Sequence, residues 1–150
     1  MRLIKPKVEI IPQESGLDGV LKQIEIAGRT CYKSEERITP SSNVEFVKRM
    51  ISNGHTAMLE HGTVYLTAPT GSWDWDLWAL VNNKYTEAKF NEHTNYITTN
   101  YRVIVENNWL SALSYISDPT PFHEKRITAR FTCDRGVSHE LVRHKKLCVA

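Results

Sequence analysis

The sequence predicts an α+β fold, with a mostly antiparallel central sheet and flanking helices. Apolar residues follow helical spacing near the N-terminus and period-two spacing in segments 63–68 and 127–133. The two kinds of segment do not alternate as a chain of βαβ units would require, which favours α+β over α/β. A length of 150 residues is typical of one domain, so we expect residues 1–150 to form a single domain.

The N-terminal part of the chain predicts a strand followed by a helix. Residues 8–12 form a short apolar stretch that ends in a proline, which is typical of an edge strand. Apolar residues then recur at helical spacing over 17–27, and Gly28 offers a stop for this helix.

The next segments predict a second helix, a tight connection and a strand. Ser42 and Glu45 have the spacing of a capping box, in which two side chains satisfy backbone donors at a helix start. Residues 53–54 are Asn-Gly, and both types tolerate the left-handed conformation that ends a helix. Residues 55–61 are then a tight connection, and residues 63–68 alternate as a strand does.

The second half of the chain gives clear signals only near its end. Residues 69–95 are irregular, and we expect a helix there. Alternation over 101–105 predicts a strand, and the apolar spacing over 109–116 predicts a short helix. Residues 127–133 alternate cleanly and predict another strand, followed by a helix over 137–144.

Composition limits the classes of partner and compartment. The formal net charge is +2, too small to indicate nucleic acid or an anionic membrane as a partner. No segment has the roughly 20 apolar residues of a membrane span, so we expect a soluble protein. The three cysteines, Cys31, Cys133 and Cys148, are widely spaced and odd in number, which argues against a disulfide framework and favours a reducing, cytoplasmic setting. Cys31 and Cys133 are most simply small apolar core residues.

Two clusters of residues could carry chemistry: residues 54–61 and residues 134–145. Residues 139–144 read H-E-x-x-x-H, one residue longer than the zinc motif H-E-x-x-H. Five helical positions rotate about 500°, so His139 and His144 cannot face one metal ion on a regular helix. His55 and His61 bracket a turn with no third ligand fixed nearby, so no metal site is predicted.

The second cluster has the chemistry of an anion-binding surface. Glu140, Arg143 and His144 lie three and four residues apart and therefore share one side of the predicted helix. Arg143 and Lys145 suit a phosphorylated, aromatic ligand such as a nucleotide or flavin, because arginine grips phosphate with two donors and lysine adds a point charge. The alternative is a solvated basic helix end at residues 143–146.

A cluster of tryptophans raises the separate possibility of nucleic-acid binding. Trp73, Trp75 and Trp78 could stack on bases, with the basic C-terminal end adding charge. Asp74 and Asp76 lie between the tryptophans and would repel phosphate. Core or interface positions are therefore the simpler interpretation, and we expect no nucleic-acid partner.

Taken together, the two clusters resemble the flavin-dependent thymidylate synthases. That family has a glycine-histidine turn followed by Glu-His, matching Gly54-His55 and Glu60-His61. It then has the signature R-H-R-x-x-S-x-x-x-x-S-x-R-Y, whose start resembles Arg143-His144-Lys145. Residues 28–32 are also similar. The resemblance covers residues 7–68 and 125–145, and residues 69–124 look like an insertion between them.

The resemblance implies both a reaction and an assembly. The family methylates dUMP to dTMP: methylenetetrahydrofolate supplies the carbon, NADPH reduces FAD, and the reduced flavin supplies hydride. The resemblance further implies a homotetramer, with FAD and dUMP sites built between subunits. The protein's part in such chemistry is to position the rings.

Carried onto this sequence, the resemblance implies specific roles. The flavin would be contacted by His55 and by the backbone of Ala57, with Cys31 approaching it. The rest of the FAD site would be lined by Arg143, His144 and Lys145. The substrate dUMP would be contacted by Glu140 and Arg143.

Several residues depart from the family pattern. Lys145 replaces the second arginine of the signature and loses its bidentate grip, and Cys148 stands where the first serine is expected. The remaining Ser-x-Arg-Tyr, which carries the catalytic arginine, is expected beyond Ala150. A truncated family member is one expectation. A catalytically incompetent fragment that binds flavin or nucleotide is the other.

Overall fold

The strands of this protein form two antiparallel sheets. The computed structural model describes residues 5–72, 74–141 and 143. In it, β1 (Lys7–Ile11) pairs with β5 (Thr128–Thr132) as a two-stranded ribbon. A three-stranded sheet has the order β2-β4-β3, made of Thr63–Pro69, Thr94–Asn100 and Glu87–Phe90. The α+β class and the antiparallel pairing are therefore confirmed, with the strands divided between two sheets.

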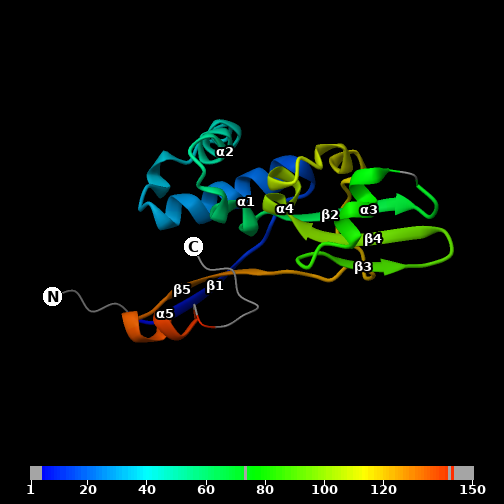
Figure 1. Ribbon diagram of the computed structural model, residues 1–150. Helices are drawn as coiled ribbons and strands as arrows, with labels where there is room; N and C mark the ends of the chain where they lie inside the picture. Colours follow the sequence, from blue (N-terminus) through cyan, green and yellow to red (C-terminus); the bar gives the residue numbers. More distant parts are fainter. Residues whose placement is uncertain (1–4, 73, 142, 144–150) are drawn as a thin grey trace.

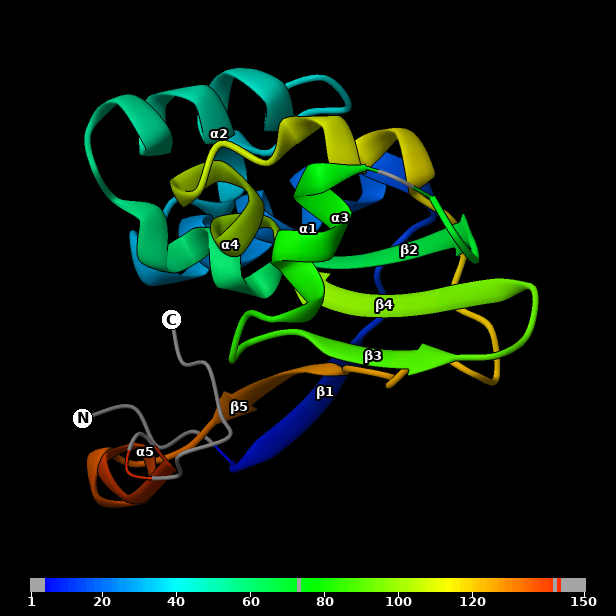
Figure 2. The same cartoon turned by 45° about the vertical axis from the view of Figure 1, so that its right-hand side comes forward.

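Helices cover one side of the three-stranded sheet, while the β1–β5 ribbon extends away from them (Figures 1 and 2). The α-helices are α1 (Gly16–Cys31), α2 (Asn43–Ser52), α3 (Trp75–Val81), α4 (Tyr101–Glu106) and α5 (Arg135–Leu141). Short 3₁₀ helices occupy η1 (Glu35–Arg37), η2 (Thr56–His61) and η3 (Leu110–Tyr115). Helix α5 lies beside the far end of the ribbon, on the opposite side from α2.

The hydrophobic core lies between α1, α2, η2, α4 and the inner face of the sheet. Leu66 of β2 stands opposite Ile97 of β4, and both side chains are buried. Helix α1 contributes Val20 and Ile24, which are also fully buried. Within the described residues, no helix is both long and apolar enough to cross a membrane.

The first helix does not stop at Gly28, as the sequence pattern had predicted, but continues to Cys31. A Cβ atom at Gly28 would lie 2.6 Å from Phe46 Cζ. The glycine is therefore a contact point where α1 approaches α2 closely. The predicted core position of Cys31 is also wrong, because Cys31 and Cys133 are both exposed.

The predicted capping box at Ser42 is wrong, although α2 begins and ends close to where it was expected. The Ser42 hydroxyl makes no capping bond and instead donates to Glu25 Oε2 at 2.9 Å. It also accepts from the Thr39 backbone N–H at 2.9 Å. The serine is thus used to satisfy a buried carboxylate, while Glu45 remains exposed.

The strand predicted over 101–105 is a helix, α4. Asn100 decides this, because its side-chain Oδ1 accepts from the Val103 N–H at 3.1 Å and caps the helix. The alternation over 101–105 therefore wrongly predicted a strand. Val103 and Ile104 are adjacent and both are buried, which a helix packed on a broad core allows.

Residues 69–95 contain a helix only over α3, and two strands were missed after it. Strand β3 and the start of β4 lie within this stretch. Strand β4 is the central strand of its sheet although its sequence, TNYITTN, is mostly polar. Residues 69–124 therefore supply part of the core. Their status as an insertion remains a prediction.

The other predicted elements agree with the structure to within a few residues. The strands over 63–68 and 127–133 are β2 and β5, and the early edge strand is β1. The short helix over 109–116 is the 3₁₀ helix η3. The last helix begins at Arg135, where Asp134 Oδ1 accepts from the Val137 N–H at 3.0 Å. The predicted helix end at His144 lies outside the described residues.

Gly62 provides a test of the packing between η2 and α1. A Cβ atom at this position would lie 2.7 Å from Ile24 Cδ1 and 2.8 Å from Val20 Cγ1, both in fully buried side chains. We expect Gly62→Ala to lower the free energy of unfolding by about 1–3 kcal/mol through overpacking, as measured by urea denaturation. Glu92→Ala, in the exposed β3–β4 turn, is the control and should change little. Unchanged stability of Gly62→Ala would contradict the packing described.

Candidate functional site

The turn that follows α2 fixes the backbone of His55. Gly54 has φ of +71°, the left-handed conformation that glycine adopts without steric cost. The Gly54 N–H donates to Ile51 O at 3.0 Å and the His55 N–H donates to Met50 O at 2.9 Å. This pair of bonds is a Schellman motif, which satisfies the last carbonyls of the helix. The sequence Asn53-Gly54 predicted this helix end.

The side chain of His55 lies beside Tyr32, which follows α1. The Tyr32 hydroxyl and His55 Nδ1 are 3.0 Å apart, at hydrogen-bond distance. Their ring centroids are 6.3 Å apart, with 28° between the ring planes. Both side chains are exposed, so together they present a planar aromatic surface. The sequence had singled out residues 28–32 only by resemblance, and had assigned no role to Tyr32.

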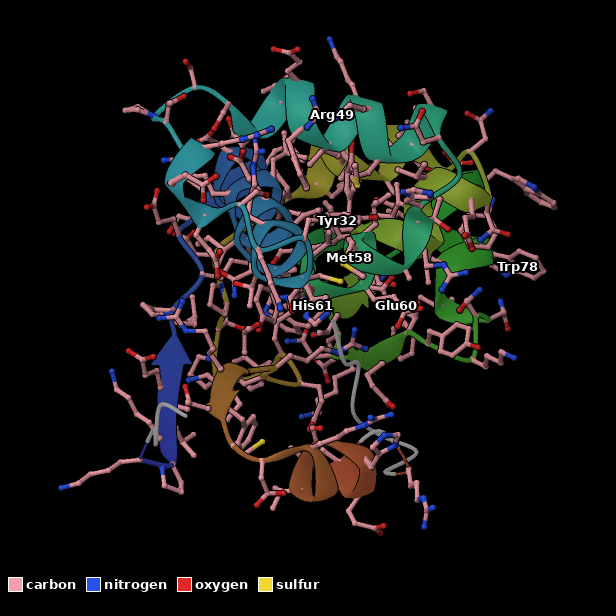
Figure 3. The ribbon with its side chains drawn as sticks, turned by 90° about the vertical axis from the view of Figure 1, so that its left-hand side faces the viewer. Tyr32, Arg49, Met58, Glu60, His61 and Trp78 are labelled. Atoms are coloured by element: carbon pink, nitrogen blue, oxygen red, sulfur yellow. The ribbon has the colours of Figure 1, made fainter. Side chains whose placement is uncertain are left out.

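The 3₁₀ helix η2 carries the remaining residues of this turn. Leu59 is fully buried and anchors η2, whereas Ala57 is exposed beside His55. Figure 3 shows Tyr32, Met58, Glu60 and His61 gathered on one face of the molecule. The structure therefore places two predicted flavin-contacting residues, His55 and Ala57, on one accessible turn.

A charged network braces η2 against α4. The Arg102 guanidinium donates to Glu60 through Nη1 and, at 2.8 Å, to Glu106 Oε1 through Nε. The Thr56 hydroxyl donates to the same Glu106 oxygen at 2.6 Å. These bonds lower the pKa of Glu106, with Thr56 as the larger cause and Arg102 as the second. Sequence reasoning missed Arg102, because it lay in a segment expected to be a strand.

His61 is the more buried histidine of the turn. Its burial lowers the pKa of the imidazole from its ordinary value, and the nearby negative charge of Glu60 offsets part of this effect. Burial therefore favours the neutral form of the His61 ring.

The second predicted cluster lies elsewhere in this chain. Glu140 and Arg143 form an ion pair of 3.2 Å, and both side chains are exposed. Helix α5 stands at the end of the β1–β5 ribbon, away from α2 and the turn that follows it (Figures 1 and 2). His144 and Lys145 lie outside the described residues. The structure of one chain does not place Arg143 beside His55.

The part of the chain described by the structure contains no group of three His, Cys, Asp or Glu side chains able to hold a metal ion. His139 instead accepts from Arg135, whose Nε lies 3.3 Å from the imidazole Nε2.

Comparisons with known proteins point to one family. A curated relative from Mycolicibacterium vanbaalenii is 36% identical over 61 residues, which is 38% of this chain and 24% of the relative. A relative from Mycobacterium leprae is 41% identical over 49 residues, 31% of this chain and 19% of that protein. Both are named flavin-dependent thymidylate synthase. The chain is similar to these enzymes over about a third of its length.

The similarity covers only part of each protein. Each match takes in about a quarter or less of the relative's own length. A relative from Mycobacterium avium gives the same picture, at 36% identity over 61 residues. No family model matches the chain, and no solved structure matches it significantly. The roles of individual site residues therefore remain predictions.

The lowered pKa of His61 predicts a pH-dependent stability. Between this lowered pKa and the ordinary value of 6.5, the unfolded state binds more protons than the folded state. The effect of His61 on the free energy of unfolding is therefore absent above about pH 6.5, and the protein becomes less stable as the pH drops below that value. We expect His61→Gln to flatten the wild-type decline between pH 7 and about pH 5, as measured by thermal unfolding across pH. His93→Gln, at an exposed turn histidine, should retain the wild-type slope. Equal slopes for both variants would refute the assignment.

Proposed function

We propose that this chain forms the flavin-contacting part of a flavin-dependent thymidylate synthase. The reaction is the reductive methylation of dUMP to dTMP with methylenetetrahydrofolate, FAD and NADPH. The observation that carries the proposal is the His55 turn, whose backbone is locked by a Schellman motif and whose ring is exposed beside Tyr32. The named relatives support the same family.

The residues of this turn suit a planar ring. An isoalloxazine ring has a large aromatic face, and the nearly parallel rings of Tyr32 and His55 offer a surface on which it can lie. Ala57 has a small side chain next to this surface, so its backbone can approach a ligand closely. When bound, FAD supplies the hydride chemistry. The part of His55 and Ala57 is to hold and orient the ring.

The phosphates of FAD and dUMP require cations that the His55 turn does not itself provide. We assign them to Arg143, His144 and Lys145, with Glu140 and Arg143 contacting dUMP. Arg143 lies on the exposed part of the chain near α5, so a second copy of the chain would have to present it to the His55 turn. The proposed assembly is therefore a homo-oligomer, a tetramer by resemblance, with sites shared between copies.

A second candidate function is flavin or nucleotide binding without catalysis. It is favoured by Lys145, which replaces an arginine of the signature and loses a bidentate phosphate contact. It is also favoured by the ion pair between Glu140 and Arg143, because in the single chain the Arg143 guanidinium already binds a carboxylate.

FAD binding tests the role of His55. We expect the purified protein to perturb the absorbance spectrum of added FAD, and His55→Ala to weaken that binding about fivefold, since one aromatic contact contributes about 1 kcal/mol. His93→Ala removes an exposed histidine of the β3–β4 turn, which belongs to a different element, and should leave the affinity unchanged. Equal affinity for wild type and His55→Ala would exclude the proposed role.

The response to dUMP then separates the two functions. A flavin spectrum that changes on adding dUMP, together with dTMP formation in the presence of NADPH and methylenetetrahydrofolate, supports the enzyme. Bound flavin without dTMP formation supports the binding fragment. Absence of bound flavin in a folded sample, checked by circular dichroism, would contradict both.

A further inference from the structure

The exposed tryptophans of α3 form a second surface, unrelated to the His55 turn. Trp75 and Trp78 are 75% and 60% exposed, the highest values among the described Phe, Tyr and Trp side chains apart from Phe90. Their ring centroids are 5.2 Å apart, with 24° between the planes. Figure 3 shows Trp78 projecting from the edge of the molecule. Large exposed aromatic groups of this kind are typical of interaction surfaces.

The fold enforces this exposure. The opposite side of α3 is anchored by Leu77 and Leu80, which are 5% and 0% exposed. Asp74 caps the helix by accepting from the Asp76 and Leu77 N–H groups at 2.9 and 3.3 Å. The indoles, three residues apart, therefore share the solvent side of a fixed helix and cannot turn inward.

Negative charge lies directly beside the two rings. The Ser111 hydroxyl is 2.6 Å from Asp76 Oδ2 and 3.3 Å from Asp74 Oδ1, which brings the two carboxylates close together. Within the described ranges, neither carboxylate has a lysine, arginine or histidine as an ion-pair partner. The surface formed by Trp75, Trp78, Asp74 and Asp76, here called the tryptophan patch, is thus aromatic and negatively charged.

Two aromatic rings elsewhere in the described chain are covered by its own cations. Lys84 Nζ lies 4.8 Å from the centre of the Tyr85 ring. The Phe46 ring has Arg29 Cζ at 4.7 Å and Arg49 Cζ at 5.5 Å. No described cation lies over Trp75 or Trp78, although indole is the strongest cation–π acceptor among the side chains.

We infer that the tryptophan patch binds a cationic segment of a partner protein, with arginine side chains stacked on the indoles. Aromatic faces attract the planar guanidinium group, and the adjacent carboxylates complement its charge. The same carboxylates repel phosphate, which disfavours single-stranded nucleic acid as the occupant. The inference is independent of any flavin chemistry at the His55 turn.

Binding of synthetic peptides tests this inference. The probe is a short glycine peptide that carries arginines, and the comparison is the same peptide with citrulline, which has nearly the same shape without the charge. Binding is followed by NMR through the indole N–H signals of the tryptophans. We expect the arginine peptide to bind at millimolar or lower concentration, with affinity that falls as salt is added, and the citrulline peptide to bind several-fold more weakly.

Variants locate the site. The double substitution Trp75→Ala and Trp78→Ala should weaken binding of the arginine peptide about fivefold to tenfold, as expected for two exposed cation–π contacts. Asp76→Asn keeps an acceptor for the Ser111 hydroxyl but removes a charge, and should weaken binding of the arginine peptide about twofold. Tyr85→Ala removes an exposed aromatic ring that already has its own cation, and should have no effect. Circular dichroism confirms that each variant is folded.

Three outcomes would overturn the inference. One is equal binding of the arginine and citrulline peptides, which would show a merely apolar surface. Another is binding of a single-stranded oligonucleotide that disappears in the double variant, which would show a nucleic-acid surface. The third is no shift of the indole signals with the arginine peptide at millimolar concentration.

Discussion

The close approach of other elements to α1 is the constraint on which the rest of the structure depends. At Gly28, α1 comes so near to α2 that a Cβ atom would overlap the Phe46 ring. At Gly62, the chain after η2 comes equally near to Ile24 and Val20 of the same helix. Interiors pack at the density of organic crystals, so such contacts leave little freedom in where α2 and η2 can lie. The position of the His55 turn follows, because it connects those two elements.

Buried charge fixes the same region more specifically. Glu25 is 1% exposed and receives two hydrogen bonds from Arg29 and one from Ser42. A buried carboxylate is tolerated only when it is paired and hydrogen-bonded, since desolvation of an unpaired charge costs several kcal/mol. Arg29 also stacks on Phe46 of α2. The start of α2 is therefore held by the charge on α1 rather than by a cap of its own.

Two exposed aromatic surfaces differ in chemistry. The Tyr32–His55 surface is aromatic, whereas the tryptophan patch pairs aromatic rings with two carboxylates that have no ion-pair partner within the described part of the chain. They lie on different elements, and we propose different ligands for them, a flavin ring in one case and arginine side chains in the other. The ribbon of β1 and β5 adds a third exposed surface, which is apolar: Val8, Ile10 and Phe131 are exposed on its strands, and Ile127 is exposed just before β5.

The sequence alone determined the α+β class, the strands over 63–68 and 127–133, and the Asn53-Gly54 turn that precedes His55. These features depend on local physics: side-chain alternation, the left-handed freedom of glycine, and the spacing of apolar residues within one element. The resemblance to flavin-dependent thymidylate synthases also came from the sequence, and partial-length relatives support it.

Only the tertiary structure decided the remaining features. Strand β4 is central although it is polar, because it pairs with the distant strand β2 on one side and with β3, which precedes it across a short turn, on the other. Ser42 binds Glu25 instead of capping α2, and Tyr32 lies beside His55, through contacts between residues 17 and 23 positions apart. The exposure of Trp75 and Trp78 follows from which side of α3 packs on the core. Such long-range contacts are set by the packing of whole elements, and no local pattern encodes them.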